Sequence, residues 1–525
     1  MSSSQVEASG CGRELGWQDM AGLYQCPQWF CDAKFGLWAH WGASSVPRLG
    51  SGWYPKHMYL EDVGTETFGA NAFSHHRQTY GHQSQFGFKD ICNLWRAEKF
   101  DADATLRQWR EWGARYAAIL ANFHDGFDNW NSNHQDWNAV KVGPHRDIVG
   151  EFAAAARRHG LPWVATIHDV DWVRNFLMGA HGADREGPLK GVPYDGILTK
   201  ADGAGKWWEG LDPAQLYGPP PALRTEEWKA QDNRAWLARH QQLIRDYRPD
   251  ALYFDGEIPY GQEGETLCAE FYRESLARHG SIQAIVQVKN TAPGTLHDIE
   301  RGGANTLQEA PWQTDTSLAY AWFLKYDEPH WHNARTVLES LCDIVSKNGN
   351  LLLSLGLYPD GTLPEDQTRE MNIVGAWLKR NGEAVYGSRP WRVFRDGSGV
   401  QSGTAPAGNA DPAGPGMPEA PPQEQTEHFN ERTVKSPPFH HDEVRFTTRG
   451  GRLFVFVLNP APGELKIPAL GTHSPARPGA IRRATLLADG SVVPFRQDGD
   501  ALRIVLPGGI PTGLPLTIAL EGVNP

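Results

Sequence analysis

Apolar and polar positions along residues 103–380 predict helices that alternate with short buried strands. Residues 105–112 and 147–159 show the spacing of amphipathic helices, and each is followed by an apolar run, at 116–121 and at 163–168. Further helices are predicted at 27–33, 234–246, 266–278, 335–346 and 366–380, and further strands at 34–42, 251–254, 282–288 and 350–356. This alternation indicates a parallel sheet with right-handed crossovers.

The long segments without a clear pattern all follow predicted strand ends. Residues 43–100 and 291–320 are predicted as irregular loops, and residues 178–230 as a long insertion. Long loops at strand ends favour a closed barrel over an open doubly wound sheet, and no Gly-x-Gly-x-x-Gly pattern follows a first strand. We therefore predict an α/β chain with a (β/α)8-like TIM barrel.

The predicted domains follow from shifts in composition. An N-terminal arm at 1–26 precedes the catalytic barrel at 27–395, and residues 396–438, rich in Gly and Pro, are predicted as a linker or surface excursion. Short strands are then predicted at 444–448, 452–458, 463–467, 481–487, 502–506 and 514–520. Their even spacing predicts a C-terminal antiparallel β-sandwich at 439–525.

Composition and charge exclude several classes of partner. The net charge of −12 and the pI of about 5.9 argue against nucleic acid or an anionic membrane. No apolar run approaches the roughly 18 residues that would cross a membrane. The first residues lack the pattern of a signal peptide, so we expect a cytoplasmic protein, or a periplasmic or secreted one if the N-terminus was trimmed. A homo-oligomer is compatible with the sequence.

Two residue types bear on the chemistry of the site. The six cysteines are scattered without a Cys-x-x-Cys pair, so the sequence predicts neither a zinc site nor a redox motif. The chain contains 21 Trp, 15 Tyr and 21 Phe. Many of these are core residues by default, but flat apolar faces beside His and acidic residues also suit a sugar-binding site.

One segment combines a buried strand with acidic residues. The apolar run at 251–254 leads into Asp255, Gly256 and Glu257. Residues at the C-terminal ends of barrel strands carry out the chemistry, and an unpaired buried carboxylate is costly, so Asp255 suits a nucleophile or general base. Glu257 shares a face with Asp255 in an extended chain and stays an alternative. An ion-paired structural aspartate is the other interpretation.

Several longer segments resemble one family of enzymes. They are WFCDAKFGLWAHWGASSVP at 29–47, FHDGF at 123–127, GPHRD at 143–147, WQTDTS at 312–317, SKNGNLLL at 346–353 and NGEAVY at 381–386. Together they resemble the α-L-fucosidases of glycoside hydrolase family 29, in the same order and over about residues 27–395. The resemblance implies a barrel with a β-sandwich and retaining hydrolysis of terminal α-L-fucosides, through a covalent fucosyl–enzyme intermediate and without a cofactor or metal. The implied partner is a fucosylated oligosaccharide or glycoconjugate.

The resemblance also implies two catalytic carboxyl groups, which in retaining glycosidases lie about 5–5.5 Å apart. Asp255 matches the family nucleophile, with Tyr253 in place of the common Trp two residues before it. Glu300, which precedes the WQTDTS segment, is the candidate acid/base, and Glu309 is the alternative. Arg301 must point away from Glu300, because a nearby cation would lower the pKa of the acid.

The remaining candidates are residues that would bind the sugar. We expect hydroxyl contacts from His40, His124, His168 and Lys289, all at predicted strand ends, and apolar contacts near the sugar methyl group from Trp53 and Trp322. Tyr253, beside the nucleophile candidate, is also expected to contact the sugar. Each His could instead be a satisfied structural residue, and each Trp a core residue. Phe123 stands where the family usually has His, and Gly52 stands where it often has Glu. These two departures bear on which sugar or leaving group the site accepts.

Two further functions are compatible with these residues. The same mechanism could act on another sugar of L-galacto configuration, such as an α-L-galactoside, whose CH₂OH group must fit where fucose has a methyl group. A non-catalytic sugar-binding protein is the alternative from another class. The two intact carboxyl groups argue against it.

Overall fold

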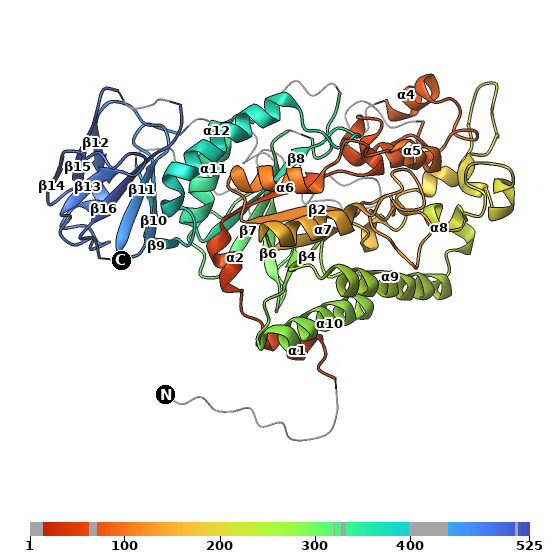
Figure 1. Ribbon diagram of the computed structural model, residues 1–525, viewed down its shortest axis with the longest axis horizontal. Helices are drawn as coiled ribbons and strands as arrows, with labels where there is room; N and C mark the ends of the chain where they lie inside the picture. Colours follow the sequence, from red (N-terminus) through yellow and green to blue (C-terminus); the bar gives the residue numbers. More distant parts are fainter. Residues whose placement is uncertain are drawn as a thin grey trace.

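The computed structural model describes residues 14–61, 71–319, 321–326, 332–397, 439–509 and 513–524. Its larger part is a closed barrel of eight parallel strands in sequential order, which confirms the predicted TIM-like fold (Figure 1). The strands are β1 (Phe35–His40), β2 (Tyr116–Asn122), β3 (Trp163–Ile167), β4 (Ala251–Phe254), β5 (Ile285–Val288), β6 (Leu296–Glu300), β7 (Trp312–Ser317) and β8 (Gly349–Gly356). β1 pairs with both β2 and β8 and so closes the barrel.

Helices surround the barrel and have the positions that the sequence predicted. They are α2 (Gln28–Ala33), α6 (Ala102–Glu111), α7 (Ile148–His159), α9 (Glu226–Tyr247), α10 (Gln262–His279), α11 (Ala334–Ser346) and α12 (Glu365–Asn381). Local signals fix their ends: the Asp147 side chain accepts the Gly150 N–H at the start of α7, and Gly160, with a φ of 64°, ends it. Within the predicted N-terminal arm, α1 (Trp17–Leu23) packs Trp17 against Tyr272 of α10.

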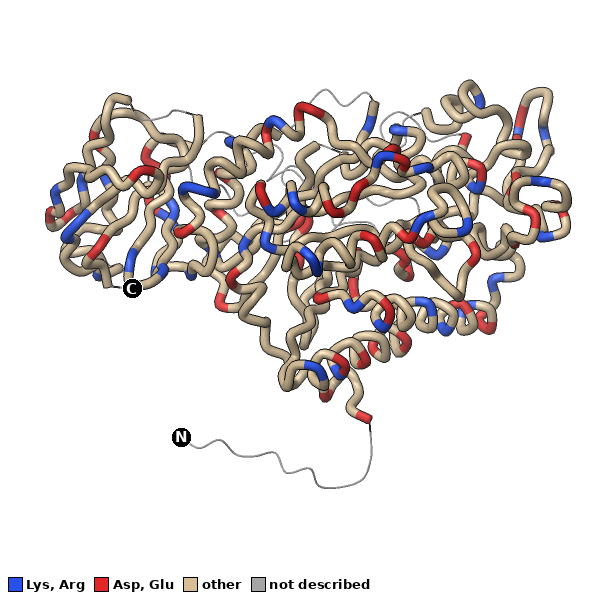
Figure 2. The backbone as a smooth tube through the Cα atoms, viewed as in Figure 1, with Lys and Arg blue, Asp and Glu red and all other residues tan. Residues whose placement is uncertain are grey.

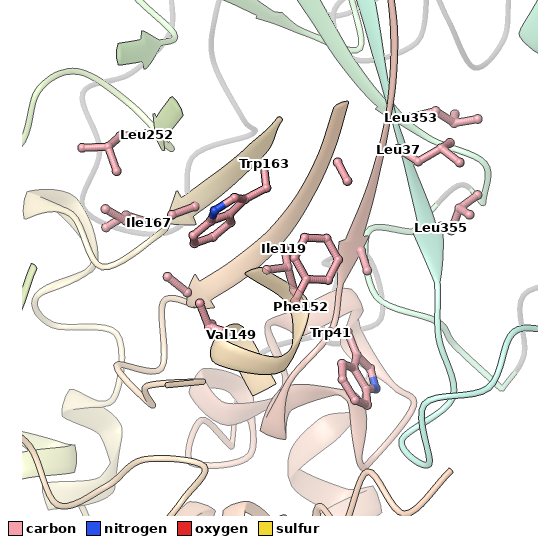
Figure 3. Packing of buried hydrophobic residues seen from close by; sticks show 14 of the residues in the cluster. Leu37, Trp41, Ile119, Val149, Phe152, Trp163, Ile167, Leu252, Leu353 and Leu355 are labelled. Atoms are coloured by element: carbon pink, nitrogen blue, oxygen red, sulfur yellow. The ribbon is translucent and has the colours of Figure 1, made fainter. Parts of the chain in front are cut away.

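The main core lies between the outer face of the barrel and these helices. Figure 3 shows Val149 and Phe152 of α7 beside Ile119 of β2, with Trp163 of β3 close by. All four side chains are almost completely buried. Burial of a side chain of this size contributes about 1.5–3 kcal/mol, so this layer stabilises the strands whose ends form the site.

The predicted loop at 291–320 was wrong, because it contains β6 and β7. The prediction searched for apolar runs, whereas β7 is buried along its whole length although only Trp312 in it is a large apolar residue. Alternate side chains of β7, Gln313 and Asp315 among them, point into the barrel and are hydrogen-bonded there; the Gln313 side chain, for example, donates to Asp298 of β6. Buried polar groups are tolerated where such bonds exist.

The prediction that residues 43–100 are mostly irregular was also wrong for part of that range. The segment holds η1 (Ala43–Ser45), η2 (Gly50–Gly52), α3 (Tyr54–His57), α4 (Ala72–Thr79) and α5 (Phe88–Leu94). These helices are short, with polar faces, so their periodicity is weak in the sequence. Residues 62–70 lie outside the described part of the chain. The predicted insertion at 178–230 contains only short turns, among them η5 (Asp195–Ile197) and α8 (Ala214–Tyr217), before α9 begins.

The C-terminal domain is built from two antiparallel sheets, as predicted. Its strands are β9 (Arg389–Asp396), β10 (Val444–Arg449), β11 (Arg452–Val457), β12 (Gly463–Ile467), β13 (Arg483–Leu486), β14 (Phe495–Gln497), β15 (Leu502–Leu506) and β16 (Leu516–Glu521). One sheet has the order β13-β16-β11-β10-β9 and the other β12-β15-β14. β9, which reaches the predicted boundary at 395, pairs with β10. Of the predicted linker, residues 398–438 lie outside the described residues.

The C-terminal domain lies at one end of the molecule, beside α11 and α12 (Figure 1). The Trp377 indole N–H donates to the Pro515 carbonyl, and the Arg445 guanidinium pairs with Asp343 of α11 at 2.6 Å. In the view of Figure 2, acidic and basic residues are interspersed along the chain, α9 and α10 included. Among the described residues, no helix combines the length and the apolar character that crossing a membrane requires.

Candidate functional site

Asp255 lies directly after β4, at the C-terminal mouth of the barrel. Its side chain is 16% exposed, and one carboxylate oxygen is 3.5 Å from Nε2 of His124. Burial raises the pKa of Asp255 to about 7; Lys289 lowers it, and Glu300 and Asp315 raise it. Asp255 therefore lies within the electrostatic reach of two other carboxyl groups and one ammonium group.

Glu300 is the last residue of β6 and lies at the same mouth. It pairs in register with Asp315 of β7, and its carboxylate is 3.7 Å from Nζ of Lys289. Glu300 is buried. The ends of β4 and β6 thus place the two predicted catalytic carboxyl groups in one cluster, with Lys289 from the end of β5 beside them.

Lys289 makes its closest contacts with two aspartates below the mouth. Its ammonium group donates to Asp298 at 2.8 Å and to Asp315 at 2.9 Å, and both carboxylates are fully buried. The Tyr253 hydroxyl donates to the same oxygen of Asp315 at 2.9 Å. Lys289 and Tyr253 were predicted to contact the sugar; their hydrogen bonds go to carboxylates of the barrel interior.

Three histidines occupy the other side of the mouth. Nδ1 of His40 is 2.9 Å from the Ser354 hydroxyl, Nδ1 of His124 is 3.0 Å from the His168 carbonyl, and Nδ1 of His168 is buried without a hydrogen-bond partner among the described residues. Burial lowers the pKa of His124 to about 3, and those of His40 and His168 well below the usual value. All three are therefore neutral near pH 7, and a neutral imidazole can both donate to and accept from a hydroxyl.

Aromatic rings line this side as well. The Trp322 ring is 4.7 Å from the His40 ring, and the Trp53 ring is 5.9 Å from that of His124. Trp172 stacks on Trp53 at 6.1 Å, and its indole N–H donates to the Asp255 carbonyl at 3.0 Å. Because Trp172 is 36% exposed, its ring forms part of the rim. A cavity of about 240 Å³ borders His124 on the side of Asp125 and Phe176, and neither Asp255 nor Glu300 lines it.

The two departures from the family pattern lie next to each other. A Cβ atom at Gly52, whose φ is 91°, would be 2.7 Å from the Phe323 ring and 2.9 Å from the Phe123 ring. The Phe123 and Phe323 rings are 4.7 Å apart, and Phe123 is 5.4 Å from the His168 ring. Gly52, Phe123 and Phe323 form an apolar patch beside the histidines, where the family pattern has polar residues.

Two of the alternative acids lie elsewhere. Glu309 precedes β7, and its carbonyl accepts from the side chain of Asn348, which directly precedes β8. Glu309 therefore lies at the N-terminal end of the barrel, opposite to Asp255. Glu257 is exposed at the rim and accepts from the Asn290 side chain at 2.9 Å.

The Arg301 side chain contacts Trp322 and Ser317. Its guanidinium lies 4.3 Å from the centre of the Trp322 ring and donates to the Ser317 hydroxyl at 3.2 Å. Arg301 has a φ of 47°, a value uncommon outside glycine. The chain therefore turns sharply after β6.

Four residues of the site were not predicted: Asp298, Asp315, Trp172 and Ser354. The sequence did contain a signal for the two aspartates. Asp298 and Glu300 are two residues apart, as are Gln313 and Asp315, and in a strand such residues share one face. Trp172 follows β3 in a segment with no such period. Among the described residues, no group of three or more His, Cys, Asp or Glu side chains is arranged to hold a metal ion.

Comparisons with known proteins identify the family of this chain. A sequence model of the alpha-L-fucosidase family matches residues 2–383 of the 525. Tissue alpha-L-fucosidase of Rattus norvegicus is 28% identical over 384 residues, which cover 70% of this chain and 71% of that protein. An alpha-L-fucosidase of Dictyostelium discoideum is 26% identical over 382 residues, with 70% and 73% coverage.

A solved structure shows the same fold. The crystal structure of Thermotoga maritima alpha-fucosidase in complex with fucose has a TM-score of 0.66 and 22% sequence identity, and the match covers 96% of this chain and 99% of that one. At this identity the likeness concerns the fold alone. The family match covers well over half of the chain, and it supports hydrolysis of fucosides. The chain therefore belongs to the alpha-L-fucosidase family of glycoside hydrolases.

Proposed function

We propose that the protein is a retaining exo-glycosidase that releases terminal α-L-fucose by double displacement. The observation that carries this proposal is the placement of Asp255 and Glu300 at the ends of β4 and β6, close enough that Glu300 raises the pKa of Asp255. A pair of facing carboxyl groups is what a retaining glycosidase requires. Glu309 lies at the opposite end of the barrel, which favours Glu300 as the acid/base.

The mechanism has two steps. In the first, a carboxylate oxygen of Asp255 attacks the anomeric carbon, the bond to the leaving oxygen breaks, and the proton of Glu300 moves to that oxygen. In the second, the Glu300 carboxylate takes a proton from water. The water oxygen attacks the anomeric carbon, and the bond to Asp255 breaks. Fucose leaves with its original anomeric configuration, and both carboxyl groups return to their starting states.

The neutral histidines are suited to hold the sugar in this reaction. His40, His124 and His168 converge within ring distances of about 5.5 Å, and the free Nδ1 of His168 offers a hydrogen bond that no described residue uses. Trp53 and Trp322 supply apolar walls for the C–H groups of the ring. Fucose in the related Thermotoga maritima structure supports a fucosylated oligosaccharide or glycoconjugate as the substrate.

The proposal is tested by following hydrolysis of an aryl α-L-fucoside by NMR. We expect α-L-fucose to appear first, before mutarotation produces the β-anomer. If the β-anomer appears first, the retaining mechanism is wrong, and if the fucoside binds without release, the protein is a sugar-binding protein. The same assay with an aryl α-L-galactoside compares the alternative sugar, and a panel of α1,2-, α1,3-, α1,4- and α1,6-fucosylated oligosaccharides determines the linkage.

A further inference from the structure

Lys289 is surrounded by carboxyl groups rather than by an open pocket. Its Nζ is 2.8 Å from Asp298, 2.9 Å from Asp315 and 3.7 Å from Glu300, and all of these side chains are buried. An ammonium group has three N–H donors, and here three carboxylates lie within reach of them. These contacts hold the ammonium in the barrel interior.

The number of negative charges in this cluster favours a proton on one of its carboxyl groups. Asp255, Asp298, Glu300 and Asp315 would carry four negative charges against the single positive charge of Lys289, and burying so large an excess is costly. Burial, and after it Asp315, raise the pKa of Asp298 well above the usual range, while Lys289 lowers it. Asp298 therefore keeps a proton more readily than an isolated aspartate, which reduces the excess of negative charge around Lys289.

The other groups that contact Lys289 carry no charge. A second cation, Arg301, also lowers the pKa of His40, and its guanidinium is held by Ser317 and the Trp322 ring. Tyr253 of β4 presents its ring 5.0 Å from the ammonium. His40 and His168, across the mouth, are kept neutral by burial and by Lys289 itself, among other charges. His297 of β6 also has a pKa that burial and Lys289 lower. Above the two aspartates, the remaining charge that Lys289 faces thus comes from Asp255 and Glu300.

We propose that Lys289 is a positioning residue whose fixed positive charge, held from below by Asp298 and Asp315, serves Asp255 and Glu300 in turn. This inference rests on the proposed function. Before the first step Asp255 is the anion and Glu300 is neutral; after it Asp255 is esterified and Glu300 is the anion. One negative charge faces Lys289 throughout, so a cation between the two carboxyl groups stabilises both states without moving.

The test compares the pH dependence of kcat/KM on an aryl α-L-fucoside in the native enzyme, Lys289→Met and Lys289→Arg. We expect Lys289→Met to move both limbs of the profile upward by about 1–2 pH units, because each carboxyl group loses a nearby opposite charge. Lys289→Arg keeps the charge and should keep both limbs within about 0.5 unit. Lys347→Met is the matched control, since Lys347 is also buried and paired with an aspartate, Asp343, but lies at the junction of α11 and β8. It should lower the unfolding temperature and leave both limbs in place.

The two aspartates provide a second test that does not depend on Lys289→Met folding. Asp315→Asn removes the compensating charge and should move both limbs downward by about 1 unit, whereas Asp298→Asn replaces a protonated carboxyl group and should leave them in place. Equal shifts in the two variants, or none in either, would overturn the inference. So would a Lys289→Met enzyme with a raised KM but unchanged kcat and limbs, because Lys289 would then be a sugar ligand. A native protein without fucoside hydrolysis contradicts the proposed function instead.

Discussion

The half of the barrel mouth built by β1–β3 carries three histidines that burial keeps neutral, whereas the half built by β4–β7 carries one lysine and four carboxyl groups. Both halves are buried and belong to one fold, so the difference comes from the side chains at the strand ends. Neutral donors and acceptors suit hydroxyl groups, whose charge does not change in the reaction. The charged half is suited to proton transfer and to charge that develops at the anomeric carbon.

The largest effect should come from the charged half. Asp255→Gly removes the nucleophile and should lower kcat/KM for an aryl α-L-fucoside by about 10³-fold or more, equivalent to several kcal/mol of barrier. Glu257→Gln is the matched control, two residues away at the exposed rim, and should change the rate by less than about threefold. A larger loss of kcat/KM in Glu257→Gln than in Asp255→Gly would show that Glu257, and not Asp255, is the nucleophile.

Glu300→Gln should lower kcat by about 10²–10⁴-fold on an oligosaccharide, because the leaving oxygen then has no proton donor. The loss should be much smaller on a substrate with an acidic leaving group such as a nitrophenol, which leaves without that proton. Glu309→Gln, at the other end of the barrel, should behave as the native enzyme on both substrates. Equal losses for Glu300→Gln on both would show that it does not protonate the leaving group.

The neutral half should give intermediate effects that are independent of pH. His168→Ala removes a hydrogen bond to the sugar and should lower kcat/KM by about 10–100-fold, the range expected for a buried partner left unpaired. Because His168 is already neutral, both limbs of the pH profile should stay in place. A shifted limb in this variant would mean that the two halves are not separate in function.

A smaller effect is expected at the apolar patch. Phe123→Ala enlarges the space beside the histidines and should raise the ratio of α-L-galactoside to α-L-fucoside hydrolysis by about 3–10-fold, since pockets that discriminate by one small group have limited selectivity. Leu94→Ala, at an exposed site on α5, controls for the loss of apolar side-chain volume in general and should leave the ratio unchanged. An unchanged ratio in Phe123→Ala would place the sugar's CH₂OH group elsewhere.

The smallest effect concerns stability. The pKa of Asp255 is raised to about 7 in the folded chain, above the usual value near 3.9 of an unfolded one. Ionising Asp255 therefore costs free energy in the folded chain. The stability that its protonated form allows is lost as the pH rises from about 4 through 7. Asp255→Asn has no such loss, so its unfolding temperature should exceed that of the native protein by about 2 °C at pH 8 and by less at pH 4. Calorimetry at both pH values measures the difference.

The sequence predicted the neutral half of the site more completely than the charged half. His40, His124 and His168 each follow an apolar run, so local pattern placed them at strand ends. β6 and β7 have no such run, because their buried residues are polar and are satisfied only by partners on other strands: Lys289 on β5 reaches Asp298 and Asp315. That pairing is not visible in any local window. Glu300 was found through its resemblance to the family rather than through its strand.

Gly52 lies against two rings, Phe123 and Phe323, that are far apart in the chain. Any side chain there meets the rings of Phe123 and Phe323, and a φ of 91° disfavours residues other than glycine. Shortening Phe123 alone leaves a void, and adding an acid at position 52 alone creates a clash. The three positions are therefore expected to be epistatic: an engineer who wishes to place polar residues at 52 and 123 must exchange both and also make room at Phe323, the nearer ring.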